Sequence, residues 1–61
     1  MPSLTSKELT AIEDILGGEQ LLVKKLKSYA SMTSDPQIKA KCEQIAAQHQ
    51  NHYDRMLSHL N

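Results

Sequence analysis

Hydrophobic residues recur every three or four positions along two segments of the chain. In the first segment they are Leu9, Ile12, Leu16, Val23, Leu26 and Ala30, with Ile15, Leu22 and Tyr29 widening the stripe on one side. In the second segment the inward positions are Ile38, Cys42, Ile45, His49, His52 and Met56, flanked by Ala46, Tyr53, Leu57 and Leu60. This spacing is typical of α-helices that bury one face against a neighbour. The pattern predicts an all-α protein with two amphipathic helices.

The first helix has a clear start signal. Thr5 and Glu8 have the spacing of a capping box, in which each side chain bonds the other residue's backbone N–H, and Leu4 and Leu9 stand at the positions of a hydrophobic staple. We therefore expect an N-terminal arm over residues 1–4 and a helix over 5–32. The Gly17-Gly18 pair interrupts this helix, either as a tolerated flaw or as a place where a neighbour or a distortion needs room.

The second helix is expected over residues 36–60, after a turn at 33–35. Asp35 can cap it with Pro36 at the first helical position, where the missing N–H does no harm. Ser34 is the alternative cap. Each helix has about 25 residues and a length of about 37 Å. A connection this short makes the helices antiparallel, so residues 1–61 form a single helical hairpin.

A hairpin of two helices cannot enclose a core, because each helix leaves much of its apolar stripe in water. We expect the second layer to come from another copy, giving an obligate homodimer that forms a four-helix bundle. Lysines gather toward the turn and acidic residues toward the open end, which favours copies with their turns at opposite ends. The same charges also complement the helix dipoles. The lysines are Lys24, Lys25, Lys27, Lys39 and Lys41, and the acidic residues are Glu8, Glu13, Asp14 and Asp54.

Composition narrows the class of protein. The chain has 61 residues, net charge +0 and 3% aromatic residues, which argues against nucleic-acid binding as its main role. Cys42 is the only cysteine, so no internal disulfide forms, and a free thiol fits a reducing compartment. There is no apolar run of about 20 residues and no signal-peptide pattern at the start. We expect an intracellular protein that binds neither membrane nor nucleic acid.

One level of the predicted hairpin is polar. Glu19 interrupts the apolar stripe of the first helix and, with the turn centred near residue 34, lies opposite Gln48 and His49, while His52 lies opposite Leu16. Two interpretations remain open. Glu19 can hydrogen-bond a histidine in a layer that fixes register, or Glu19, His49 and His52 can coordinate Zn²⁺, Fe or Mn.

Other candidate chemistry is sparse. There is no catalytic triad, phosphate loop or CxxC pair, so no residue is assigned a catalytic role. His59 is expected at a solvated helix end, and Cys42 as a small buried hydrophobe opposite Leu26.

The chain resembles ferritin-like bundles, and more particularly small spore coat proteins of the Coat F type. The resemblance covers residues 4–60 and rests on E-D-x-L-x-x-E-Q in the first helix, D-P before the second, and the closing A-x-x-H-x-x-H-Y. It implies a ferritin-like four-helix bundle, with Glu19 matching the carboxylate of the first helix and His52 the histidine of the second. His49 stands where that motif has Glu, which counts against a di-iron oxidase and favours a mononuclear site or no metal.

The resemblance also implies a function. Coat F type proteins are structural components of sporulating bacteria, so it implies a protein deposited in the spore coat beside other coat proteins. The expected function is therefore a small, non-enzymatic assembly protein that forms homodimers. The alternative is a metal-binding, ferritin-like bundle, with or without redox activity, whose Glu19, His49 and His52 site lies at the dimer centre.

Overall fold

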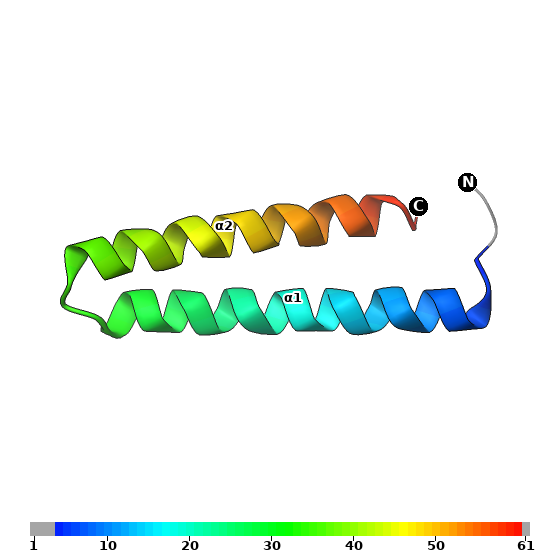
Figure 1. The fold of residues 1–61 in the computed structure, drawn as a ribbon, viewed down its shortest axis with the longest axis horizontal. Coiled ribbons are helices and arrows are strands. Elements are labelled where there is room, and N and C mark those ends of the chain that lie inside the picture. Colours follow the sequence, from blue (N-terminus) through cyan, green and yellow to red (C-terminus); the bar gives the residue numbers. More distant parts are fainter. Residues whose placement is uncertain (1–3, 61) are drawn as a thin grey trace.

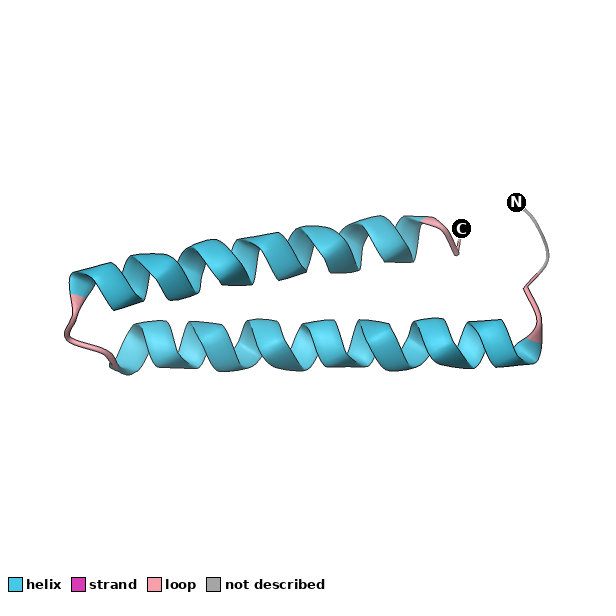
Figure 2. Ribbon diagram, viewed as in Figure 1, coloured by secondary structure: helices cyan, strands magenta, loops and turns pink. Residues whose placement is uncertain are grey.

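The structure, a computed structural model, describes residues 4–60 and consists of two antiparallel α-helices (Figure 1). Helix α1 spans Ser6–Met32 and α2 spans Pro36–Ser58. A short connection joins them, and no strand occurs among the described residues (Figure 2). The all-helical hairpin is confirmed. Helix α2 ends two residues before the expected position 60, and the expected arm lies outside the described residues except for Leu4.

The side chains at the helix starts confirm both predicted caps. Thr5 Oγ1 accepts a hydrogen bond from the Glu8 N–H at 3.1 Å, and Glu8 Oε1 accepts one from the Thr5 N–H at 3.0 Å. The hydrogen bond from the Thr5 backbone, followed by the one with its side chain, lowers the pKa of Glu8 below its ordinary value. At α2, Asp35 Oδ1 accepts from the N–H groups of Gln37 and Ile38 at 2.8 and 3.2 Å. Asp35 is therefore the cap, and Ser34 is not.

The helices meet along a narrow line. The buried residues are Leu16, Val23, Ala30 and Ala46. The first three were expected on the inner stripe of α1. On α2, Ala46 is buried and Tyr53 half-buried, and they lie one position beyond the predicted Ile45 and His52 respectively. The predicted Cys42, Ile45, His49 and Met56 are half-buried.

Two predicted inward positions of α2 are therefore wrong for the hairpin. Ile38 is 51% exposed, and the side chain of His52 is 61% exposed. Ala46, expected only as a flank, is 3% exposed. The apolar stripe is wide enough to face two neighbours, whereas a hairpin supplies one. Residues one position from the contact line turn about 100° away from it.

The molecule is one helix thick. Its principal extents are 47 × 16 × 11 Å, and the shortest matches the diameter of a single helix with its side chains. The chain exposes 4802 Å², whereas a compact monomer of 6.9 kDa exposes about 4000 Å². The hairpin thus leaves about 800 Å² more surface in water than a closed fold of its mass would.

One side of the hairpin carries several exposed apolar side chains. On each helix, the residues that directly precede the contact-line positions in the sequence share one side, as Ile15 does beside Leu16. We call this side the open face. Facing antiparallel helices run in opposite senses, so these residues fall on the same side of both helices. The open face comprises Ile15, Leu22 and Tyr29 of α1 and Ile38, Ile45 and His52 of α2. Of these, Ile15 is 50% exposed and Tyr29 61%.

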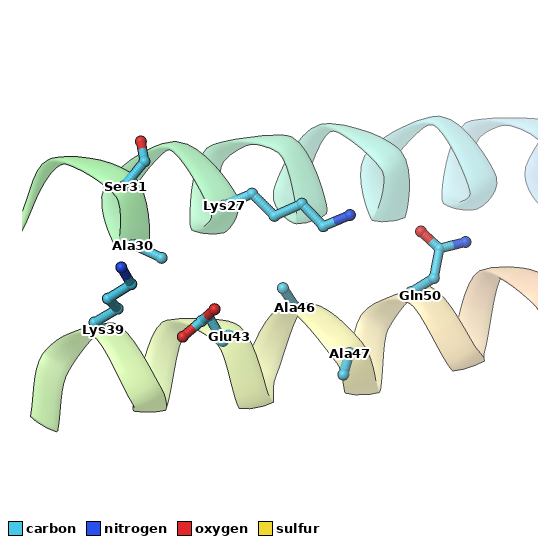
Figure 3. Close-up of a pocket in the computed structure, with 8 residues that line it drawn as sticks. All are labelled: Lys27, Ala30, Ser31, Lys39, Glu43, Ala46, Ala47 and Gln50. Atoms are coloured by element: carbon cyan, nitrogen blue, oxygen red, sulfur yellow. The ribbon is translucent and has the colours of Figure 1, made fainter. Parts of the chain in front are cut away.

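The opposite side of the hairpin combines charged and polar side chains with alanines. An open groove of about 500 Å³ runs along it, between Lys27 and Ser31 of α1 and Lys39, Glu43 and Gln50 of α2 (Figure 3). Neither described helix carries an apolar stretch that is long enough to cross a membrane. The open face thus presents large apolar side chains, whereas the grooved side presents charged and polar side chains beside alanines.

Candidate functional site

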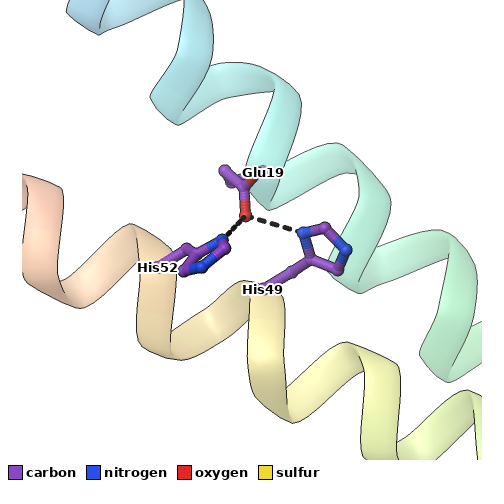
Figure 4. A group of neighbouring side chains, drawn as sticks. All are labelled: Glu19, His49 and His52. Carbon is purple, nitrogen blue, oxygen red and sulfur yellow. Dashed lines mark hydrogen bonds and ion pairs between the residues drawn. The ribbon is translucent and has the colours of Figure 1, made fainter.

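The polar level predicted from the sequence exists as a three-residue cluster. Glu19 projects from α1 toward His49 and His52 of α2 (Figure 4). Each of the three offers one ligand atom, and these atoms lie within 4.8 Å of one another. The structure thus brings together all three residues that were expected to form a site.

Local sequence explains how Glu19 is held. It follows buried Leu16 by three residues and precedes buried Val23 by four, so it lies on the inner side of α1 between two packed turns. Its side chain is 18% exposed. It also lies thirteen residues from either end of α1, so the cluster is at the middle of the longer helix.

The two histidines approach a single carboxylate oxygen. His49 Nδ1 is 2.9 Å from Glu19 Oε2, a hydrogen bond that His49 donates when this nitrogen carries the proton. His52 Nδ1 is 3.9 Å from the same oxygen, too far for a hydrogen bond. The rings lie edge to face, with centroids 5.9 Å apart and an interplanar angle of 88°. His49 is the tightly held partner, and His52 is the more exposed one.

This arrangement can act in two ways. As an ion pair or neutral hydrogen bond, Glu19 and His49 fix the register of α1 against α2, because a slip of one residue would separate them. As a ligand set, two imidazole nitrogens and one carboxylate oxygen match the donors of zinc and iron sites. No buried side-chain oxygen or nitrogen among the described residues lacks a hydrogen-bond partner, so burial alone does not require an ion at this level.

Other residues expected near this level lie elsewhere. Gln48 is exposed and outside the cluster. Tyr53, expected only as a flank of the stripe, accepts a hydrogen bond from Gln20 Nε2 at 3.1 Å. This pair was not predicted from the sequence. The sequence did contain a sign of this pair. Gln20 directly follows Glu19 and Tyr53 directly follows His52, so both residues are turned in the same direction away from the cluster.

The remaining candidates lie outside the cluster. Cys42 is a free thiol and is half-buried rather than fully buried. His59 caps the C-terminal end of α2 and is exposed, as expected.

Comparisons with known proteins add no assignment. No model of a known protein family, no curated protein and no solved structure matches this chain. The hairpin and its cluster are therefore the features from which a function can be inferred.

Proposed function

We propose that this chain is a small, non-enzymatic assembly protein whose open face binds a second copy, forming a homodimeric four-helix bundle. The observation that carries the proposal is the uncovered surface. The hairpin exposes about 800 Å² more than a compact monomer of its mass. A standard protein interface buries about 800 Å² on each partner. One further copy is thus enough to cover the excess.

The apolar character of this surface supports a stable partner. Tyr29, Ile38 and Ile15 are each half exposed or more on the same side of the hairpin. Monomeric proteins rarely leave large apolar patches in water. Covering it with an identical face supplies the second layer that a helical domain needs around its core.

Symmetry and charge favour a second copy as the occupant. Glu19 lies at the middle of α1, so a twofold axis through that point places the two polar levels next to each other. With the turns at opposite ends, the lysine-rich turn end of one copy lies against the acidic open end of the other. Turns at the same end would oppose like charges.

The biological setting that we propose follows the sequence resemblance. A dimer of this kind is a compact building block for a layered assembly, and small spore coat proteins of the Coat F type are the proteins that the chain resembles. We therefore propose a structural role in a spore coat, beside other coat proteins. Finding the protein in coat extracts of a sporulating culture, and its loss after coat removal, would support this assignment.

Mass in solution tests the assembly. Sedimentation equilibrium of the tag-free chain in buffer with a chelator should give twice the mass of one chain across micromolar concentrations. A single-chain mass at all concentrations, together with a cooperative helical melt, would exclude the proposal. The chelator removes any contribution of bound ions to the association.

A further inference from the structure

We infer that Glu19, His49 and His52 form a mononuclear site for a divalent first-row transition-metal ion, with Zn²⁺ or Fe²⁺ as its occupant. This goes beyond assembly. All three ligands come from one hairpin, so the site does not require the second copy.

The distances fit coordination. Four ligands placed tetrahedrally around Zn²⁺ at about 2.1 Å are about 3.4 Å apart. Glu19 Oε2 is 2.9 Å from His49 Nδ1 and 3.9 Å from His52 Nδ1, so the two distances lie on either side of this value. All three ligand atoms lie within 4.8 Å of one another, so shifts of at most about 1.4 Å, within the reach of side-chain rotations, bring them into position.

The second histidine adds a ligand atom that the hydrogen bond between Glu19 and His49 does not use. His49 alone satisfies the Glu19 carboxylate through the 2.9 Å hydrogen bond. His52 has 61% of its side chain exposed and could point into water, yet its Nδ1 faces the same oxygen (Figure 4). A cation between the three groups gives His52 a reason for this orientation, because each group then contributes one lone pair.

The donor set defines the class of ion. Two imidazoles and one carboxylate suit Zn²⁺ in sites with a fourth, open position, and they suit Fe²⁺ in facial arrangements with several open positions. Hard ions such as Mg²⁺ and Ca²⁺ prefer oxygen ligands throughout. In the single hairpin, the exposed side of His52 leaves room for water at the remaining positions.

The decisive variant is His52→Ala. Because His52 is exposed and makes no hydrogen bond among the described residues, its removal should leave the hairpin folded. Glu19→Gln keeps the shape of the side chain while removing its charge. His59→Ala is the matched control, since His59 is the remaining histidine and lies outside the cluster.

The experiment uses tag-free protein stripped of metal with a chelator. Zn²⁺ and, without oxygen, Fe²⁺ are titrated by calorimetry, and Co²⁺ is added as a reporter because its visible spectrum reveals its coordination geometry. Wild type and His59→Ala should bind one equivalent per chain and melt at a higher temperature with the ion. His52→Ala and Glu19→Gln should lose affinity by at least 10- to 100-fold, the loss typical of disturbing even outer-shell partners.

Two results would contradict the proposed metal site. Equal affinity of wild type and folded His52→Ala would overturn the site, as would a loss in His59→Ala as large as in His52→Ala. Circular dichroism of the metal-free variants establishes that they are folded. Mass in chelator tests dimerisation separately, so a monomer that binds one ion would reject the proposed assembly and retain the site.

Discussion

Truncation of Ile15 to Ala tests the role of the open face. Ile15 is 50% exposed in the hairpin, so about half of its side chain remains for a second copy to cover. Full burial of such a side chain contributes about 1.5–3 kcal/mol, and the remaining half therefore contributes about 1 kcal/mol. Twofold symmetry repeats the loss, which amounts to about 2 kcal/mol per dimer and about a 30-fold weaker dimerisation.

The hairpin itself should tolerate the substitution. Ala has a higher helix propensity than Ile by a few tenths of a kcal/mol, which offsets part of the packing that the Ile15 side chain provides within its own chain. We expect Ile15→Ala to shift the monomer–dimer equilibrium measured by sedimentation equilibrium over a concentration series. Its helical content at concentrations that keep it dimeric should equal that of wild type.

Leu21→Ala provides the matched control. Leu21 lies on the same helix and is 54% exposed, but it is two residues from buried Val23 and therefore about 200° round the helix from the contact line. Its truncation should leave the dissociation constant unchanged. Equal weakening by both variants, or no weakening by Ile15→Ala, would refute the assignment of this face to the interface.

Three further predictions concern the caps and glycines. Thr5→Ala removes the capping box and should lower the free energy of unfolding by about 1 kcal/mol in denaturant titrations. Because the folded pKa of Glu8 lies below its ordinary value of 4.5, its contribution is present above that value and is lost as the pH falls through the folded pKa. The wild-type advantage over Thr5→Ala should therefore shrink in acid, and an advantage independent of pH would contradict this account. Asp35→Ala leaves two N–H groups of α2 without their acceptor and should cost about 1 kcal/mol, measured in the same way, whereas Asp35→Asn should retain most of the stability. Nothing lies within 4 Å of a Cβ added at Gly17 or Gly18, so Gly17→Ala should stabilise the protein by about 1 kcal/mol in thermal melts. Gly18 is three residues from Ile15 on the open-face side, so in the proposed dimer Gly18→Ala should gain less, and equal gains would count against close contact there.

The helices could be predicted because their signals are local. The Thr5–Glu8 pair and the Asp35-Pro36 step act through hydrogen bonds within a single turn, so neighbouring residues are enough to specify them. The helical period and short connection then determine the antiparallel pairing. This is why residues 19 and 49 could be placed opposite each other from the sequence.

The rotation of α2 could not be predicted in the same way. Ile38 and His52 belong to an apolar stripe broad enough for two neighbours, and the pattern does not tell which of its edges faces α1. The edge of the stripe that faces α1 is the one with small side chains, because the buried Ala30 and Ala46 leave room for the other helix. The cluster survives the rotation because Glu19 and the histidines reach across the edge of the contact line.

The short connection also favours one order of contact formation when the hairpin folds. Contacts beside the turn join residues that are close in the chain, whereas His49 and Glu19 are separated by 30 residues. Closing a loop costs entropy that grows with its length, so every pair formed near the turn shortens the loop left for the next pair. Loop-closure entropy therefore favours a folding order in which residues beside the turn pair before Glu19, His49 and His52 come together.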